Sequence, residues 1–498
     1  MDSVPVHRVV IVGGGFGGLY AVRILGRTAG VATTLVDRRN FHLFQPLLYQ
    51  VATGALSPGE IAQPLRSILR RDRRTTVLLG EAVDLDPDRH EVHLSDGGIL
   101  PYDSLIVATG ARFSYFGHDA WAADAPGLKS LDDATEIRRR ILIAFEAAER
   151  ELDPARRSEW MTFVIAGGGP TGVELAGALG EIANDTLRND FRRIRPPDAR
   201  IVLVEAMPRV LPTYPPDRSA SAQRQLERLG VQVRTATRVV GIDDRSVRIA
   251  SEAGEETVPT RTALWAAGVL ASSFARRVAV VTGAETDRSG RVVVGADLTV
   301  AGHSEIFVVG DAAVMPWPGH GPVPGVAQGG IQGGRYAAKT IVRRLRGWPT
   351  PPFRYSDRGN VAVIGRLSGV TDIAWLGPFG RQGGFTAWLL WLGIHIAYLI
   401  GFANRIVVVT RWAYSFLTRG RSSRLITGQP LVPVLDDPVE GATSPPDEGA
   451  AGGRSDDATR SALDEVDEHV LPEMLRVGVE GPTPVQAGDE RDELGERP

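Results

Sequence analysis

The stretch VVIVGGGFGG at residues 9–18 decides the fold of this chain, and FVIAGGGPTG at residues 163–172 repeats it. In each, four apolar residues predict a buried strand, and the glycines that follow fit the G-x-G-x-x-G turn. Such a turn lets the backbone approach a pyrophosphate and directs the N-terminus of the next helix at it. One such turn is also compatible with a plain glycine turn in an α/β sheet. Two, each between a strand and a helix, predict two dinucleotide sites on one chain.

An acidic residue follows each turn at the end of the next strand. Asp37 ends the strand at 33–36, and Glu205 ends the strand at 201–204. A carboxylate in this place accepts a hydrogen bond from an adenosine ribose and repels a 2′-phosphate. Glu205 therefore predicts a preference for NADH over NADPH. The phosphates are expected on three glycines of each turn, Gly13, Gly15 and Gly18 in the first and Gly167, Gly169 and Gly172 in the second.

The two units predict an α/β fold with two Rossmann-like dinucleotide-binding domains and a C-terminal membrane-associating helical segment. We assign the strand at 305–309, which ends in Gly310-Asp311 before an expected helix, to the first unit, so the second unit is inserted in the first. The predicted parts are a first nucleotide-binding segment at 1–112, the inserted domain at 113–292, the rest of the first domain at 293–355, a membrane-anchoring region at 356–432 and a disordered acidic tail at 433–498.

The composition narrows the possible chemistry. A chain of 498 residues needs more than one core. It has no cysteine, which excludes disulfides, iron–sulfur ligation and thiol redox chemistry, and no metal is expected. Residues 433–498 hold 18 acidic residues and 5 arginines, so the remaining 51 basic and 41 acidic residues leave a net charge of +10. A cationic body suits nucleotides and an anionic lipid surface, and no nucleic-acid-binding module is recognisable.

The stretch 382–403 is almost entirely apolar. Its part at 385–403 is barely long enough to span a bilayer, and His395 and two glycines weaken that interpretation. We favour a pair of amphipathic helices lying in the membrane interface, and a buried dimer interface is a further possibility. Three tryptophans are expected to anchor the interfacial helices, Trp388, Trp391 and Trp412.

Further stretches resemble one family, the type II NADH dehydrogenases, which are single-subunit flavoprotein NADH:quinone oxidoreductases. The resemblance covers about residues 6–430, and its most specific marks are DRRNFHLFQPLLYQVA at 37–52, AQPLR at 62–66 and AQGGIQ at 327–332. The tail pattern of tryptophans with His395, Asn404-Arg405 and Trp412 is also typical of the family. It implies non-covalent FAD in the first unit, NADH as substrate in the second and a membrane quinone as acceptor. Without transmembrane machinery the enzyme is not expected to pump protons.

The resemblance extends the expected cofactor sites beyond the glycines. Asp37 would bind the FAD ribose, and Asp311 would accept a hydrogen bond from the ribityl chain, although an aspartate before Ala-Ala also fits a helix N-cap. Gly268 is expected beside NADH. The other expected FAD-binding residues are Arg38, Gln45, Ala108, Gly110, Ala327 and Gln328.

Three residues are candidates for the chemistry. Glu174 lies on the helix after the second turn, where the family resemblance implies a role in positioning the nicotinamide or relaying a proton; the alternative is an acid that complements the helix dipole. Gln328 and Gln332 are four residues apart on a glycine-rich helix expected from Pro324 to about Leu345, hence on one face. They are expected to line the quinone pocket, unless the glycines serve only close helix packing.

The predicted protein is a peripheral enzyme on the cytoplasmic face of the plasma membrane that forms a homodimer. Two other functions share the same dinucleotide sites. A soluble reductase would pass electrons to an iron–sulfur protein and would have no use for the tryptophan-rich tail. A flavoprotein NADH sensor would use the acidic tail to recruit a partner.

Overall fold

The computed structural model describes residues 6–400, 402–418, 420–421 and 423–427. The first glycine-rich turn belongs to a six-stranded sheet, in which the outer strand β20 is antiparallel to its neighbour and the other strands run parallel. The central strands are buried on both faces, which explains their unbroken apolar sequence. The strand order is β20 (Thr299–Val300), β21 (His303–Val308), β9 (Ser104–Val107), β1 (His7–Val12), β2 (Val31–Asp37) and β5 (Thr75–Leu79).

The second glycine-rich turn belongs to a separate four-stranded parallel sheet. Its order is β13 (Val231–Arg234), β12 (Arg200–Val204), β11 (Thr162–Ala166) and β17 (Thr262–Trp265). The main helices of this part are α5 (Leu131–Arg150), α6 (Pro154–Trp160), α7 (Pro170–Glu181) and α8 (Pro216–Arg228). Ser130 caps α5 in a capping box with Asp133, which explains why the helix begins there.

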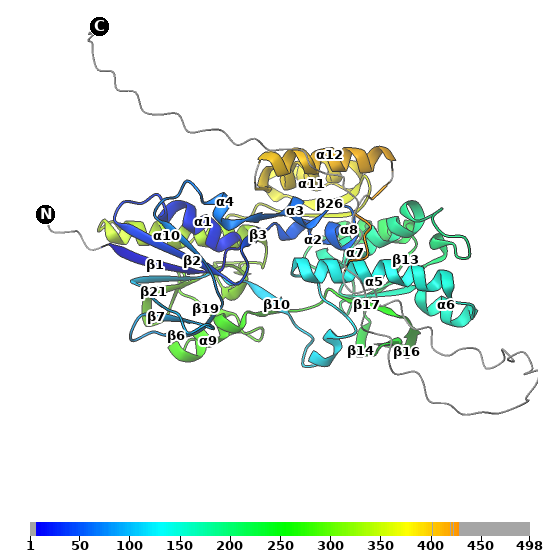
Figure 1. Ribbon diagram of the computed structural model, residues 1–498, viewed down its shortest axis with the longest axis horizontal. Coiled ribbons are helices and arrows are strands. Elements are labelled where there is room, and N and C mark those ends of the chain that lie inside the picture. The colour runs from blue at the N-terminus through cyan, green and yellow to red at the C-terminus, as the bar shows by residue number, and fades with distance from the viewer. Residues whose placement is uncertain (1–5, 401, 419, 422, 428–498) are drawn as a thin grey trace, which may run out of the picture. The chain divides into compact units, whose positions relative to one another are not determined.

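The chain crosses between the two sheets twice. β10 (Ala111–Phe113) leaves the first and pairs antiparallel with β18 (Val269–Ala271), on which the chain returns; Figure 1 shows β10 between them. β21 then lies beside β9, so the chain rejoins the first sheet after completing the second. The exact domain boundaries proposed from the sequence are not decided by this pairing and stay predictions.

Smaller elements surround the two sheets. They include two three-stranded antiparallel sheets, β6-β7-β8 and β14-β15-β16. Their bounds and those of the remaining small elements are β3 (Phe41–Leu43), α2 (Leu48–Ala52), α3 (Pro58–Ile61), β4 (Ala62–Pro64), α4 (Leu65–Ile68), β6 (Ala82–Asp86), β7 (Glu91–Leu94), β8 (Ile99–Pro101), β14 (Arg238–Ile242), β15 (Ser246–Ser251), β16 (Gly254–Pro259), α9 (Ser273–Thr282) and β19 (Val292–Val293).

The helix expected directly after Gly310-Asp311 is absent, and that prediction was wrong. These residues form a single 3₁₀ turn, Gly310–Ala312, followed by the short strands β22 (Ala313–Val314), β23 (Pro316–Trp317) and β24 (Gly321–Pro322). The long helix comes later as α10 (Ala327–Leu345), close to its predicted range. It packs along α1 (Phe16–Leu25), the helix that follows the first turn.

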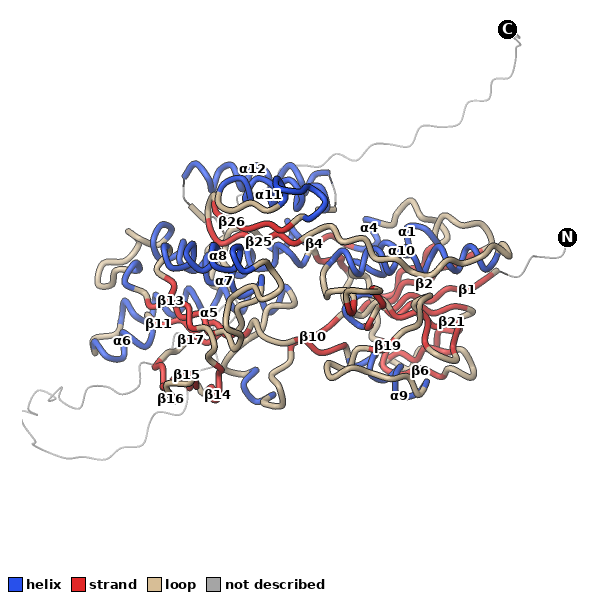
Figure 2. Tube along the Cα trace, turned by 180° about the vertical axis from the view of Figure 1, so that it is seen from behind, coloured by secondary structure: helices blue, strands red, loops and turns tan. Residues whose placement is uncertain are grey.

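The C-terminal part is a hairpin followed by two helices. The hairpin is β25 (Asn360–Gly365) and β26 (Ser368–Asp372), a 3₁₀ segment follows at Ala374–Gly380, and the helices are α11 (Phe385–Tyr398) and α12 (Phe402–Thr418). Figures 1 and 2 both show β26 between these helices and the pair α7 and α8, and α11 packs on both hairpin strands. Gly393 lies inside α11 without interrupting it. Among the described residues, no helix combines the length and apolar character needed to cross a membrane.

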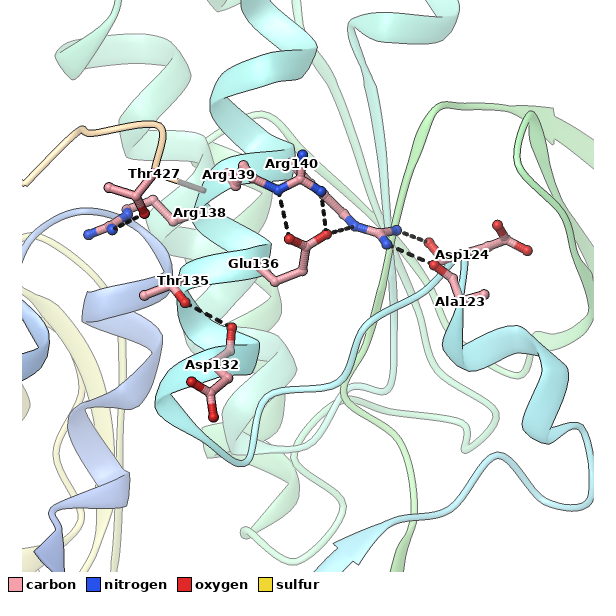
Figure 3. A network of polar contacts seen from close by, with 9 residues as sticks. All are labelled: Ala123, Asp124, Asp132, Thr135, Glu136, Arg138, Arg139, Arg140 and Thr427. Atoms are coloured by element: carbon pink, nitrogen blue, oxygen red, sulfur yellow. Dashed lines mark hydrogen bonds and ion pairs between the residues drawn. The ribbon is translucent and has the colours of Figure 1, made fainter. Parts of the chain in front are cut away.

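Polar contacts on α5 hold the end of the described chain in place. Arg138 is buried and donates to the Ser423 carbonyl at 3.2 Å and to the Thr427 hydroxyl at 3.5 Å. On the same helix Glu136 bridges Arg139 and Arg140, and Arg140 also binds the carbonyls of the 123–124 loop (Figure 3). The segment after α12 is therefore fixed against the second unit. The predicted disordered tail lies outside the described residues.

Candidate active site

The two glycine-rich turns have the same backbone geometry. Gly13 after β1 and Gly167 after β11 have φ values of +106° and +107°, which residues with a Cβ rarely adopt. A Cβ added at Gly18 or Gly172 would lie 1.8 Å from the carbonyl oxygen of Gly13 or Gly167, respectively. Both positions therefore require glycine so that the helix can begin directly against the strand end.

The middle glycine of each turn faces open space. A Cβ added at Gly15 or at Gly169 would have no atom within 4 Å, and both residues have ordinary φ values of −71°. These are the positions at which a pyrophosphate can approach the backbone. The protein's own packing therefore does not require glycine at these two positions, and the space beside them is open to a ligand.

The two acidic residues clamp the turns. Asp37 accepts from the Gly14 amide at 2.6 Å, and Glu205 accepts from the Gly168 amide at 2.5 Å. Burial raises the pKa of Asp37, against the opposing effect of the Gly14 and Arg39 amides. Each acid therefore has a structural function in its turn beside any contact with a ribose, and a carboxylate has lone pairs enough for both.

A cavity of about 830 Å³ begins at the first turn. It passes the ends of β1, β9 and β21, the start of α10 and the start of α7, and it reaches Ile394, His395 and Tyr398 on α11. Among the predicted site residues, those that line it are Gly13, Gly15, Asp37, Arg38, Gln45, Ala108, Gly110, Glu174, Asp311, Ala327 and Gln328.

Other predicted residues do not line this cavity. Gly18 and Gly172 are buried in their turns. Gly268 has a φ of +67° and lies against the Phe116 ring at the crossing between the sheets, and Glu205, Gly167 and Gly169 stand at the second turn. The second unit contributes instead Pro170, Thr171, Glu174 and Tyr214 to the cavity.

Glu174 is enclosed where the cavity meets α7. Its Oε1 accepts from the Val363 amide of β25 at 3.4 Å, and removal from bulk water raises its pKa to about 8. Burial and the nearby Glu174 charge also raise the pKa of Tyr214. A carboxyl group with this pKa can hold or release a proton near neutral pH.

The structure places only one of the two predicted glutamines at the cavity. Gln328 lines the cavity, but Gln332 exchanges two hydrogen bonds of 2.9 Å with the backbone of Ser356 outside it. The glycines of α10 mostly serve helix packing, since a Cβ at Gly334 would lie 2.0 Å from the Gly17 carbonyl. Gly330 is less constrained, with its nearest neighbours at 3.5 Å. The prediction that both glutamines line one pocket is therefore not supported for Gln332.

His395 carries the cavity wall into the C-terminal helices. Its Nδ1 lies 2.8 Å from the Trp391 carbonyl, which can only accept, so Nδ1 bears the hydrogen and Nε2 is an acceptor. Burial lowers the pKa of His395 to about 4, which keeps the ring neutral at neutral pH. Its ring also stacks on Trp391 at 4.3 Å between centroids.

The predicted tryptophan anchors face inward. Trp391 is only 2% exposed and packs at 5.4 Å from the Trp412 ring, whose indole nitrogen donates to Gln50 at 2.7 Å. Trp391 is therefore a core residue, and the prediction of a lipid anchor there was wrong. Among the described residues of the C-terminal part, the large exposed apolar side chains include Trp375, Phe379, Phe385, Leu389, Ile406, Val407, Val409 and Tyr414.

Several residues that line the large cavity were not predicted from the sequence. Tyr49 lines the cavity and stands in the 37–52 stretch, where a single tyrosine among apolar residues gave a weak signal. No spacing rule pointed to Tyr214, nor to Asn360 and Val361, because the hairpin that begins at Asn360 reaches the cavity only through tertiary packing.

The fold and the cavity define a class, the oxidoreductases that bring two dinucleotides together between two Rossmann-type units. In agreement, a family model described as pyridine nucleotide-disulphide oxidoreductase matches residues 7–336. Two curated relatives from Mycobacterium tuberculosis match a larger part of this chain. The type II NADH:quinone oxidoreductase NdhA is 47% identical over 432 residues, covering 85% of this chain and 90% of its own, and Ndh is 45% identical over 430 residues, covering 85% and 91%.

This chain belongs to the type II NADH:quinone oxidoreductases. Its fold is similar to that of NDH2 from Plasmodium falciparum solved in complex with NADH, with a TM-score of 0.76 at 19% identity, covering 85% of this chain and all of that one. Since the chain has no cysteine, the disulphide chemistry in the broader family's description has no residue to act through here.

Proposed function

We propose that this protein is a peripheral membrane enzyme that oxidises NADH and reduces a membrane quinone, with FAD as cofactor and without proton pumping. The observation that carries the proposal is the cavity of about 830 Å³, which runs from the first glycine-rich turn past Glu174 to His395. Its walls come from both nucleotide units and from α11. An electron-transfer enzyme with two substrates and one cofactor needs such a junction.

The part of the cavity at the first unit fits non-covalent FAD. The volume of the whole cavity lies within the range of cofactor sites, and Gly15 and Gly110 leave open space beside the backbone. Arg38 and Lys129 supply positive charge for phosphates, and Asp311 supplies an acceptor. Bound there, FAD would accept a hydride from NADH and pass two electrons to the quinone. The N-terminus of α10 at Ala327 lines the same cavity and favours negative charge on a group bound there.

The second unit is the proposed NADH site. Gly169 offers the open backbone for the pyrophosphate, and Glu205 at the end of β12 disfavours the 2′-phosphate of NADPH. Arg209 is the nearest cation in sequence after Glu205. It donates to the Pro212 carbonyl at 2.9 Å and is not paired with Glu205. Pro170 and Thr171 line the large cavity, so a nicotinamide entering from this turn would reach the flavin site.

The quinone is proposed to enter beside α11. Gln328 can donate a hydrogen bond to a quinone carbonyl, while His395 Nε2 can accept one from a quinol hydroxyl. Gln332 is left out of this site. The exposed apolar side chains on the C-terminal part, led by Phe379 at 80% and Trp375 at 65%, support a surface that lies on lipid.

We further propose that this surface rests on the cytoplasmic face of the plasma membrane, where arginines of the cationic body meet anionic lipid. A homodimer that uses part of the C-terminal helices is proposed as well.

Steady-state oxidation of NADH by the purified, yellow protein tests the function. We expect fast reduction of a short-chain quinone and little reduction of a ferredoxin. Gln328→Ala should raise the KM for quinone with the flavin still reduced by NADH, whereas Gln332→Ala, outside the cavity, serves as the control. A colourless protein after reconstitution with FAD, or efficient ferredoxin reduction without quinone reduction, would refute the proposal.

A further inference from the structure

A second, smaller cavity of about 110 Å³ adjoins the large one. Tyr49 and Glu174 line both cavities, so these two side chains form the partition between them. The three inward-facing tryptophans of α11 and α12 cover the small cavity, which is large enough for several water molecules. The large cavity thus has a neighbour that is lined both by these tryptophans and by charged side chains.

Carboxyl groups continue from the partition along one face of α7. Glu174, Ala178 and Glu181 are spaced by four and three residues, and all three line the small cavity. Glu181 lies two turns, about 10 Å, beyond Glu174. The helix then continues as one π turn, Ile182–Thr186, whose Asp185 also lines the cavity and is exposed to solvent. The row of acids therefore runs from the surface to the large cavity.

Glu181 is held firmly at the middle of this row. Its Oε2 accepts from Arg421 at 2.7 Å, its Oε1 accepts from the Arg366 amide, and its side chain is 17% exposed. Arg421 also donates to the Thr53 carbonyl at 3.1 Å. Burial raises the pKa of Glu181, as it does that of Glu174, which widens the pH range over which each carboxyl can hold a proton.

The hydrogen-bond pattern leaves the Tyr49 hydroxyl as a donor. The Trp412 indole donates to the Gln50 oxygen, so the amide nitrogen of Gln50 faces Tyr49 and donates to its oxygen at 3.0 Å. The Tyr49 hydrogen is then left for another acceptor. Because Tyr49 lines both cavities, it can pass a proton between water on one side and Glu174 on the other.

The proposed reaction requires a proton from solvent. NADH, a quinone and one proton yield NAD⁺ and a quinol, and NADH supplies two electrons and one of the two hydrogens. The second hydrogen comes from water in every turnover, and it must reach a cavity that protein and lipid cover on the quinone side.

We propose that the small cavity is the proton-uptake path of this enzyme, with Asp185 at its mouth and Glu181 relaying protons through water and Tyr49 to Glu174. The inference rests on the proposed function. Glu181 acts through Glu174 and is therefore a relay and positioning residue. The titratable and charged side chains that face the path are Glu174, Glu181 and Asp185 of α7 and its π turn, Tyr49 of α2, Arg366 of the hairpin and Arg421 after α12.

The substitution Glu181→Gln tests the path in the full-length, flavin-loaded protein. We expect kcat for quinone reduction to fall roughly tenfold at pH 8, less than the 100-fold or more expected for loss of a direct acid or base. The solvent deuterium isotope effect should rise, while reduction of the bound flavin by NADH, which takes no proton from water, should keep its rate. Glu181→Asp should recover most of kcat.

A spectroscopic measurement gives a readout apart from turnover. The infrared band of the protonated Glu174 carboxyl, identified by its loss in Glu174→Gln, should exchange rapidly after transfer of the wild-type protein into D₂O. In Glu181→Gln the same exchange should be at least several times slower.

Glu60 offers the matched control. It is a buried acid paired with Arg411 of α12 at 3.0 Å, and it lines neither cavity. Glu60→Gln loosens a comparable contact to the C-terminal part and should leave the isotope effect unchanged. Wild-type kcat and exchange in Glu181→Gln, or equal losses in both variants, would overturn the path. A wild-type protein that reduces no quinone would instead refute the proposed function.

Discussion

The two glycine-rich turns are nearly identical in backbone and differ in what surrounds them. Each has a left-handed first glycine, an open middle glycine, a tightly packed last glycine and an acid on its amide. The helix after the first turn packs on α10, where Gly17 meets Gly334, and the large cavity closes around it. The helix after the second packs on β25, where Gly177 meets Ile364. Under the proposed function, the same backbone turn holds a resident cofactor in one unit and an exchanging substrate in the other, according to its neighbours.

The largest effect is expected from a Cβ at the last glycine of either turn. Gly18→Ala and Gly172→Ala each place a carbon 1.8 Å from a carbonyl oxygen, and overpacking of this kind costs about 1–3 kcal/mol of unfolding free energy. Gly18→Ala should yield protein without flavin, while Gly172→Ala should keep the yellow colour and lose reduction by NADH. Flavin absorbance and stopped-flow reduction measure this. Loss of flavin in Gly172→Ala would break the comparison.

The middle glycines separate ligand binding from stability. Gly15→Ala and Gly169→Ala introduce no clash within the protein, so the thermal unfolding of the apoprotein should not change. The first variant should weaken FAD retention and the second should raise the KM for NADH. A drop in apoprotein stability in either variant would contradict the assignment of open ligand space.

The next largest effect concerns Glu174, which has no acidic counterpart in the first helix. With its pKa near 8, the carboxyl should be protonated below pH 8, and quinone reduction should decline as pH rises above that value. Its folded-state pKa exceeds the ordinary 4.5, so its contribution to stability is complete below pH 4.5 and is lost as pH rises to 8. Glu174→Gln should lower kcat roughly 100-fold and remove both pH dependences. Rate profiles and urea unfolding between pH 5 and 9 check this, and unchanged profiles would argue against the assigned pKa.

A smaller effect is expected from the acid that clamps the second turn. Glu205→Gln keeps an oxygen for the Gly168 amide and removes the charge that opposes a 2′-phosphate. The KM for NADPH should fall roughly tenfold, or about 1.4 kcal/mol, with a smaller change for NADH. Asp37→Asn in the first turn should change flavin retention and leave the ratio of NADPH to NADH unaffected. A shifted ratio in Asp37→Asn would mean that the two sites are assigned to the wrong units.

The smallest effect is a gain in stability. Gly330→Ala meets its nearest atoms at 3.5 Å within a helix, so it should raise the unfolding free energy by roughly 0.5–1 kcal/mol. Gly334→Ala, which would approach the Gly17 carbonyl to 2.0 Å, should destabilise the same helix. Differential scanning fluorimetry of the two variants measures the contrast. Equal destabilisation would show that the packing of α10 on α1 is uniformly tight.

Local patterns predicted the elements that local physics controls. The strands at 9–12, 163–166 and 201–204, the helix beginning near Ser130 and, to within three residues, the long helix expected from Pro324 were all predicted. Apolar runs, glycine turns and caps specify such elements within a few residues. The helix after Asp311 was wrongly predicted, because Gly-Asp at a strand end fits a turn as well as an N-cap.

Side-chain roles at long range were harder to predict. A helical spacing of four placed Gln328 and Gln332 on one face, but a neighbouring loop at Ser356 captured the second amide. A tryptophan in an apolar segment is typical of a membrane anchor, and only the contacts of Trp391 with His395 and Trp412 reveal a core residue. The exposed Trp375 and Phe379, by contrast, gave no signal, since no periodic pattern contains them.

The sequence by itself determined the two dinucleotide turns, the acids that follow them and the absence of thiol chemistry, because each depends on residues adjacent in the chain or on composition alone. The tertiary structure decided which of those residues share a cavity. It brought Glu174, Gln328 and His395 to one cavity, and Glu181 to Arg421, across separations of 67 to 240 residues. Close packing, and not sequence spacing, determines which distant side chains meet.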